Sequence, residues 1–437
     1  MNNIKQPDAM TIKKVRILNL FGTFDHEIKF NRNITIIMGE NGVGKTITLR
    51  LIEAIFSRKL EYLFDKEFSE IIISFHKETW HVTKSVDNTQ KFPEPSIHIK
   101  STRKGVEPLC VNYSMLMPRM SSFIVREKEN VWLNRRTGME LSREDILERY
   151  GSEALGIEYP EWYLHQCEQN RVSLIKTQRL FQDKNKNDSR NMLSVNKYSN
   201  ELSALMQEEI SKAAKSTGDL DRTFPKRLLK QIRSNHTYLV SEILDELHKL
   251  EKHRLELSDL GLLTETEATD TIISDIDEKD KTMISVLHLY VKDSWQKLHH
   301  YDVLYKKLSL LKDIINSHFQ HKVFSVDSSR GFVIMPLKTD TNSNITNVEK
   351  AEKEIEVSML SSGEQNELVL FYELLFKCDD KDLILIDEPE ISLHLDWLQK
   401  MIGDLVRITA TNRASLLIAT HSPDFVGDNY ELVQNLS

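Results

Sequence analysis

The chain has 437 residues, of which 40% are hydrophobic and 28% charged, and its formal net charge is −8. This balance predicts a folded protein of two or three domains with a sizeable core, and the negative charge argues against indiscriminate binding of the whole chain to nucleic acid. No apolar run reaches the roughly 18 residues of a membrane span, and the N-terminus lacks a signal-peptide pattern. We therefore expect a cytoplasmic protein without membrane contact. Cys110, Cys167 and Cys378 are scattered, so we expect reduced thiols and no disulfide framework.

The first predicted elements are strands. Residues 12–20 and 27–30 have strand-like patterns on either side of a turn, and residues 71–75 and 80–84 predict a hairpin. Residues 93–101 predict a turn and a short strand. The charged residues 126–150 predict a helical segment.

A glycine-rich loop stands between a predicted strand and a predicted helix. Residues 34–38 form an apolar run, and apolar side chains recur at helical spacing from Ile47 to Phe56. Between them, residues 39–46 (GENGVGKT) fit the pattern G-x-x-x-x-G-K-[ST]. Backbone N–H groups of such a loop, aided by the helix N-terminus, bind phosphates. The expected ligands of ATP are Gly39, Asn41, Gly42, Gly44 and Lys45, and the Thr46 hydroxyl is expected to bind Mg²⁺.

Residues 185–320 predict a helical insertion. Its start, residues 185–200, is polar and expected to be an exposed loop. Apolar side chains then repeat at intervals of three and four from Leu239 to Leu250 and from Ile284 to Leu311. The simplest arrangement is an antiparallel pair of helices, which acts either as a lid or docking surface or as a brace for the rest of the chain.

Positive charge is concentrated before this pair. From Asn170 to Ser234 there are twice as many Lys and Arg as Asp and Glu. Such a stretch contacts either DNA phosphates or an acidic partner protein. Because no known nucleic-acid-binding motif accompanies it, a solvated surface that docks a partner is favoured. The cations at its end are Arg222, Lys226, Arg227, Lys230 and Arg233.

Two adjacent carboxylates follow an apolar strand at residues 383–386. Asp387 and Glu388 would repel each other unless a cation or a reacting water shared their site. We expect Asp387 to bind Mg²⁺ through water and Glu388 to polarise the water that attacks the γ-phosphate. A second strand, residues 415–419, leads to His421. A histidine there is either structural or a γ-phosphate contact, and the neighbouring carboxylates favour the contact.

These motifs, in this order, resemble the ABC-type ATPase superfamily in its SMC-like and OLD-like branch. By this resemblance, residues 39–46 are the Walker A loop, Asp387 and Glu388 end Walker B, and His421 is the switch histidine. Residues 360–365 (LSSGEQ) resemble the signature motif, although Ser362 replaces a glycine, and residues 392–396 take the place of the D-loop without its common sequence. The resemblance implies an α/β fold of the ABC-type P-loop NTPases, a mixed sheet with helices on both faces, with a mainly helical insertion.

The resemblance also implies a mechanism. Two copies would enclose two ATP molecules, and Ser361, Gly363 and Glu364 of one copy would contact the ATP of the other. Residues 171–180 resemble the Q-loop, a strand that leads to Gln178. That glutamine either binds Mg²⁺ or the attacking water, or is merely an exposed strand end. Phe21 or Phe24 either stacks on adenine or packs in the core.

The expected organisation has three parts: an N-terminal ATPase lobe at 1–180, the insertion at 181–320, and a C-terminal lobe at 321–437. The signature lies too far along the chain for a transporter subunit, and the insertion is too short for the arms of an SMC protein. Residues 422–437 are too few for the nuclease domain of OLD-like ATPases.

The remaining resemblance is to the stand-alone ATPases of the Septu, PARIS and retron anti-phage systems. It implies a homo-oligomeric ATPase that scaffolds or controls a separate effector, expected to be a nuclease. The alternative is an SMC-like ATPase that acts on DNA in repair or recombination.

Overall fold

The computed structural model describes residues 12–31, 33–87, 94–112, 124–128, 131–142, 157–175, 194–233, 238–264, 280–338, 349–350, 353–380, 382–391 and 394–436. The chain divides into two compact units. The first unit comprises Met1–Thr177, Cys378–Ile391 and Leu398–Ser437, and the second comprises Gln178–Lys377 and Ser392–Trp397. The first unit therefore contains segments from both ends of the chain.

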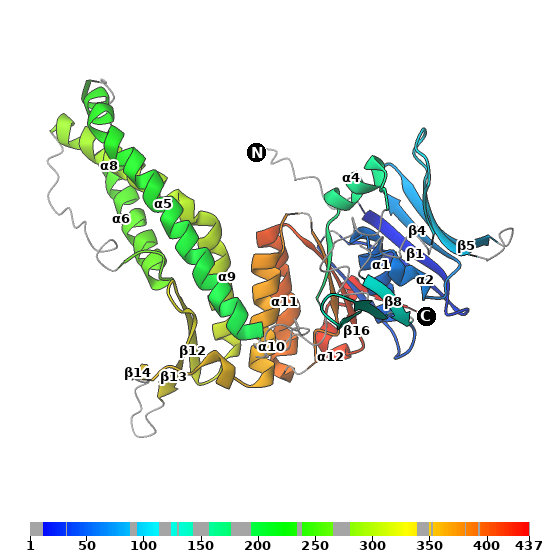
Figure 1. The fold of residues 1–437 in the computed structure, drawn as a ribbon. Helices are drawn as coiled ribbons and strands as arrows, with labels where there is room; N and C mark the ends of the chain where they lie inside the picture. The colour runs from blue at the N-terminus through cyan, green and yellow to red at the C-terminus, as the bar shows by residue number, and fades with distance from the viewer. Residues whose placement is uncertain are drawn as a thin grey trace. The chain divides into compact units, whose positions relative to one another are not determined.

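The first unit contains a parallel sheet of five strands in the order β11-β15-β16-β3-β17. Its strand β16 is labelled in Figure 1. The strands are β3 (Ile34–Met38), β11 (Val172–Ile175), β15 (Leu383–Asp387), β16 (Ser415–Thr420) and β17 (Val433–Asn435). Every residue of β15 and β16 is buried, as expected for central parallel strands that are covered on both faces. The strands predicted around the Walker motifs are therefore confirmed.

The first unit also has an antiparallel sheet, in the order β2-β1-β4-β5-β6-β7. Its strands are β1 (Ile12–Leu20), β2 (Phe24–Lys29), β4 (Glu70–Phe75), β5 (Thr79–Asp87), β6 (Glu94–Ser101) and β7 (Leu109–Asn112). The pairing of β4 with β5 confirms the predicted hairpin. The α/β class is confirmed, with parallel and antiparallel strands in separate sheets.

The helix predicted within residues 126–150 is wrong in the described part of that range. Three strands form a small antiparallel sheet there: β8 (Ile124–Lys128), β9 (Val131–Asn134) and β10 (Met139–Ser142). The physical reason is the turn between β9 and β10, where Gly138 has a φ of 66°. A positive φ suits a tight turn between paired strands and does not suit a helix.

Helix α1 (Lys45–Phe56) is part of the core that joins the two main sheets of the first unit. Leu49, Leu51, Ile52 and Ile55 are all 0% exposed, so this helix is buried on most of its circumference. The other helices that lie wholly or largely in this unit are α2 (Glu61–Phe64), α4 (Glu161–Gln169), α11 (Leu395–Asn412) and α12 (Pro423–Val426). No helix of the described residues is both long and apolar enough to cross a bilayer.

The second unit is mainly helical. Its longer helices are α5 (Ser194–Arg233), α6 (Val240–Asp259), α8 (Lys281–Leu298), α9 (Asp302–His318) and α10 (Ser362–Tyr372). Its strands are β12 (Lys322–Asp327), β13 (Gly331–Lys338) and β14 (Glu349–Lys350). A 3₁₀ turn at Val357–Met359 precedes α10, and a π-helical turn at Glu373–Lys377 follows it.

Both predicted helices are present, the first as α6 and the second as α8 and α9, and side chains of α6 and α8 form one buried cluster. The structure differs from the prediction in α5, an additional long helix that begins inside the segment expected to be a loop. Its buried side chains include four large apolar ones whose spacing is helical although polar residues separate them: Val195, Tyr198, Leu202 and Met206. The second predicted helix is interrupted at His299–Tyr301, where a 3₁₀ turn separates α8 from α9.

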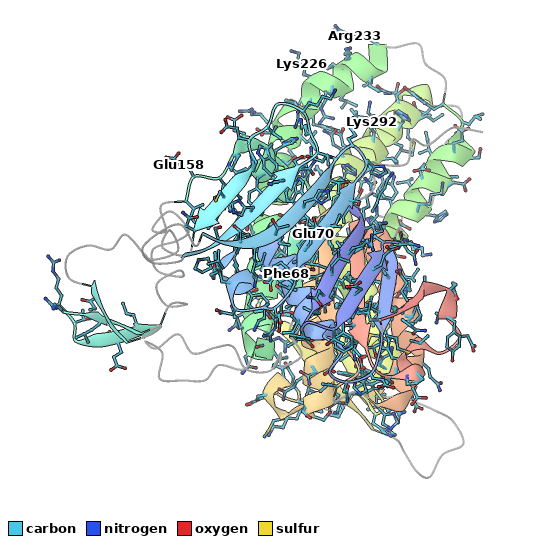
Figure 2. All side chains as sticks on the ribbon, turned by 90° about the vertical axis from the view of Figure 1, so that its right-hand side faces the viewer. Phe68, Glu70, Glu158, Lys226, Arg233 and Lys292 are labelled. Carbon is cyan, nitrogen blue, oxygen red and sulfur yellow. The ribbon has the colours of Figure 1, made fainter. Side chains whose placement is uncertain are left out.

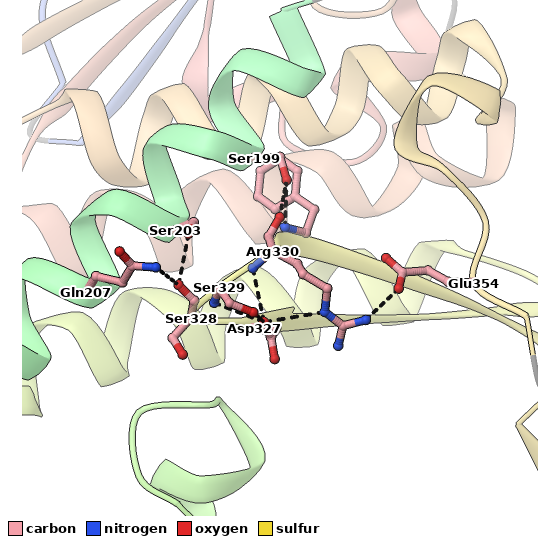
Figure 3. A network of polar contacts seen from close by, with 9 residues as sticks. Ser199, Ser203, Gln207, Asp327, Ser328, Ser329, Arg330 and Glu354 are labelled. Carbon is pink, nitrogen blue, oxygen red and sulfur yellow. Dashed lines mark hydrogen bonds and ion pairs between the residues drawn. The ribbon is translucent and has the colours of Figure 1, made fainter.

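Hydroxyl groups of α5 hold the turn between β12 and β13 (Figure 3). Ser203 Oγ donates a hydrogen bond to the Ser328 carbonyl at 2.9 Å, and Ser199 Oγ donates to the Arg330 carbonyl at 3.1 Å. Gly331 follows with a φ of 79°, and a Cβ atom there would lie 2.0 Å from the carbonyl oxygen of Ser199. The turn can therefore approach the helix this closely only with glycine at this position.

We predict that Gly331→Ala lowers the free energy of unfolding by about 3 kcal/mol, because the added methyl group must push the turn away from α5. Urea unfolding followed by circular dichroism measures this loss. Gly105→Ala is the control, since Gly105 has the same φ of 79° but no neighbour within 4 Å. It should cost about 1 kcal/mol. Equal losses in the two variants would contradict the close approach.

Candidate functional site

The glycine-rich loop connects β3 to α1, as the sequence predicts. Gly42 and Gly44 both have a φ of 91°, a left-handed conformation that favours glycine. A Cβ atom on Gly44 would also lie 2.8 Å from Leu20 Cδ2. The loop conformation therefore depends on glycine directly before the first residue of the helix.

Lys45 is buried at this loop, with 6% of its surface exposed. Its Nζ donates hydrogen bonds to the carbonyl oxygens of Gly39 at 2.7 Å and Glu40 at 2.9 Å. The loop is also held from β2, where Nε2 of the buried His26 donates to the Val43 carbonyl at 2.7 Å. No pattern in the sequence indicates His26, because only the packing of β2 beside the loop gives this histidine its role.

Asp387 reaches the loop from the other end of the chain. Thr46 Oγ1 donates a hydrogen bond to Asp387 Oδ1 at 3.1 Å. Burial raises the pKa of Asp387, and the charge of Glu388 acts in the same direction, against the opposing effects of Thr46, Arg50 and Lys45. A buried carboxylate whose pKa is raised would gain from a bound cation, so Thr46 and Asp387 suit a hard divalent metal ion.

Glu388 adopts an unusual backbone conformation at the end of β15. Its φ is 46°, which is uncommon for a residue with a Cβ atom and is often found at functional sites. Its N–H still donates to the Ala419 carbonyl at 2.8 Å, so the backbone turns only after this last contact with β16. The Glu388 carboxylate lies 3.5 Å from His421 Nδ1.

A third carboxylate, Glu390, organises the end of β16. Its Oε1 accepts hydrogen bonds from Thr420 Oγ1 at 2.5 Å and from the His421 backbone N–H at 3.2 Å. The same oxygen lies 3.4 Å from His421 Nδ1. His421 is therefore placed between Glu388 and Glu390. Glu390 is not among the residues predicted from the sequence, although a further carboxylate two residues after Glu388 is a signal that could have indicated it.

The signature residues lie in the second unit, at the N-terminus of α10. Ser361 and Glu364 form a capping box there, in which each side chain accepts a hydrogen bond from the backbone N–H of the other residue. Gly363 lies in the first turn of the same helix. Gln178 is outside the described residues, and so are residues 392–393 of the expected D-loop.

The two aromatic candidates for an adenine contact differ in their surroundings. Phe24 packs against the core of the first unit and stacks on His26 with ring centroids 5.9 Å apart. Phe21 is 39% exposed, has a φ of 56°, and lies beside Gly44, with its Cε2 3.1 Å from the position of a Cβ on that glycine. The geometry therefore favours Phe21 for stacking and Phe24 for the core.

The predicted basic stretch ends on α5. Arg227 is ion-paired with Asp293, and Arg222 lies 3.2 Å from Asp219. The remaining cations, Lys226, Lys230 and Arg233, are exposed on α5, and Lys292 is exposed on α8. Figure 2 shows Lys226, Arg233 and Lys292 on these helices.

The chain was compared with protein families, curated proteins and solved structures. The family model described as AAA ATPase domain matches residues 10–426. No curated protein matches the chain. The chain is similar to the Smc head domain with an extended coiled coil, bound to the C-terminal domain of ScpA, from Pyrococcus furiosus, with 12% identity and a TM-score of 0.33 over 95% of this chain and 91% of that chain. It is also similar to the SMC head domain from Thermotoga maritima, with 11% identity and a TM-score of 0.33 over 98% and 95% of the two chains.

We predict that Glu390→Gln lowers kcat for nucleoside triphosphate hydrolysis about 10- to 100-fold and changes KM little, because the His421 ring loses its fixed position. Steady-state kinetics measures both constants. Glu158→Gln, at an exposed glutamate of the first unit, is the control and should match the wild type. Adding His421→Ala to Glu390→Gln should cause little further loss. Additive losses would show that Glu390 does not act through His421.

Proposed function

The chain belongs to the family of the AAA ATPase domain, and from that premise we propose that it binds ATP with Mg²⁺ and hydrolyses it at the ends of β3, β15 and β16. The observation that carries this proposal is the hydrogen bond between Thr46 and Asp387. It joins two motifs from opposite ends of the chain at a single point. Lys45 and the glycine-rich loop provide phosphate ligands at the same point.

Each residue of this site has its own proposed role in ATP hydrolysis. Thr46 and Asp387 hold Mg²⁺, which supplies positive charge to the phosphate oxygens when it is bound. Lys45 exchanges its carbonyl contacts for the β- and γ-phosphates. Glu388 accepts the proton of the attacking water, and His421, placed between Glu388 and Glu390, donates a hydrogen bond to the γ-phosphate.

We also propose that the chain assembles through its ATP sites. Two copies bind face to face, and Ser361 and Gly363 of one copy contact the ATP held by Lys45 of the other. Gln178 belongs to the same site by its place in the sequence. Because the γ-phosphate is the group that both copies share, its loss on hydrolysis separates them. The proposed switch is therefore an ATP-bound dimer that opens as ATP is consumed.

The biological role that we propose is control of a separate effector, a nuclease, in anti-phage defence in the bacterial cytoplasm. Its support is the resemblance of the motifs to stand-alone ATPases of such systems. A mainly helical second unit is also suited to partner docking, since helices present side chains on rigid surfaces.

We predict that Glu388→Gln traps the ATP-bound assembly, because the amide cannot accept the proton of the attacking water. The protein is co-expressed with the products of its neighbouring genes and purified with ATP and Mg²⁺. Native mass spectrometry then gives the mass and composition of the assembly. Glu388→Gln with Lys45→Ala is the matched control and should stay monomeric.

The outcomes of this experiment separate the parts of the proposal. An assembly with a second polypeptide supports the effector role and identifies the effector. A bare dimer that retains DNA instead supports an ATPase that acts on DNA. Wild-type turnover by Glu388→Gln would contradict the role of Glu388 as the base.

A specific feature favours DNA contact as the second candidate function. Lys226, Lys230 and Arg233 lie at helical spacing on one face of α5. Among the described residues, no carboxylate is within ion-pair distance of these three side chains. Unpaired cations in a row on an exposed helix suit the phosphates of a nucleic acid backbone.

We predict that replacing Lys226, Lys230 and Arg233 together by alanine weakens binding to a short duplex of mixed sequence. The slope of log K against log salt concentration should fall by about 0.9 for each lost phosphate contact. Fluorescence anisotropy at several salt concentrations measures it. Lys215→Ala, at an exposed lysine of the same helix, is the control. An unchanged slope in the triple variant would exclude this face as a DNA contact.

A further inference from the structure

The carboxylate of Glu364 has partners on both of its oxygens. Oε2 accepts hydrogen bonds from the Ser361 N–H at 2.8 Å and from Ser361 Oγ at 2.9 Å. Oε1 lies 2.6 Å from Nζ of Lys322, the first residue of β12. The side chains of Glu364 and Lys322 are 10% and 25% exposed, so this ion pair is largely withdrawn from water.

The charge of Glu364 is maintained by these contacts. Burial raises the pKa of this carboxyl, but the hydrogen bonds from Lys322 and Ser361 outweigh burial and hold the pKa below its usual range. A negative charge is thus fixed in the first turn of α10, beside the hydroxyl of Ser361. That charge suits the helix dipole but opposes the approach of any second anion to the same helix end.

Lys322 is placed to neutralise the charge of Glu364 and so to reduce its repulsion of a second anion. Its ammonium group contacts the oxygen of Glu364 that does not bind Ser361. The pair therefore leaves the capping box intact while it cancels the net charge of the carboxylate. Without Lys322, a buried carboxylate would face an incoming phosphate with no neutralising partner at this distance.

We propose that Lys322 is a positioning residue of the signature turn: by neutralising Glu364, it allows Ser361 and the N-terminus of α10 to accept the γ-phosphate of ATP bound by a second copy. This inference rests on the proposed ATP-bound dimer. It adds a residue of β12 to those on which the stability of that dimer depends. Lys322 itself contacts Glu364 and is not proposed to touch the nucleotide.

The test uses the Glu388→Gln protein, so that ATP persists, and measures the dissociation constant of the dimer by mass photometry with ATP and Mg²⁺. Adding Lys322→Met should weaken dimerisation tenfold or more. Lys322→Arg keeps the positive charge and should stay within about threefold of the parent. Binding of a fluorescent ATP analogue at concentrations below dimerisation should be the same with Lys322→Met, since the loop of residues 39–46 is untouched.

A double variant separates charge from structure. Glutamine at position 364 keeps the capping box, because its side-chain oxygen also accepts from the N-cap N–H, but it carries no charge. Adding Glu364→Gln to Lys322→Met should therefore restore dimerisation to within about threefold of the Glu388→Gln parent. The restoration is the result that a merely structural role of Lys322 would not give.

Each contrary result has one meaning. If the Glu388→Gln protein does not dimerise with ATP, the proposed dimer and this inference both fail. If it dimerises and Lys322→Met leaves its affinity unchanged, the inference alone is overturned. If Lys322→Met weakens the dimer but Glu364→Gln does not restore it, Lys322 acts by supporting the fold and the inference is again overturned.

Discussion

The register of three parallel strands is the constraint on which the ATP site depends. β16 lies between β15 and β3, with Asp387 opposite Ala419 and Met38 opposite Thr420. Consecutive side chains of a strand point to opposite faces, so a slip of one residue would turn Asp387 away from Thr46. The buried Ile and Leu side chains of these strands fix the register. The contact between the two ends of the chain is therefore a consequence of core packing.

The same core explains why left-handed backbone conformations persist at the site. They occur at Gly44, at the beginning of α1, where glycine adopts them without strain, and at Glu388, at the end of β15, where they are strained. Helix α1 is largely buried and β15 is fully buried, so neither element can shift without losing packing. The strain at Glu388 directs the chain from the sheet towards Glu390 and His421. Rigidity in the core thus places the carboxylates around the histidine.

The sequence predicts those parts of the fold and the site that depend on residues close together in the chain. The strand, loop and helix around Lys45 follow from spacing alone, because each side chain's role is set within a few residues. Helix α5 was missed because polar residues separate its buried side chains and its neighbours supply the packing. The helix predicted at residues 126–150 is wrong because Gly138, with its positive φ, forms a turn between two strands, and this outweighs the helix propensity of the charged residues. The position of Glu390, two residues after Glu388, marks it as a candidate, but its contacts with His421 arise only because β15 and β16 are neighbours in the sheet.

Side-chain contacts of β12 connect α9 to the first turn of α10. The Asn316 side chain, near the end of α9, bonds both the N–H and the carbonyl of Phe324, at 2.8 and 2.9 Å. Two residues earlier on the same strand, Lys322 holds Glu364. In the proposed dimer, a partner that bound these helices and displaced β12 would change the charge beside Ser361. By thermodynamic linkage, ATP held at Ser361 would then change the affinity for that partner by the same factor.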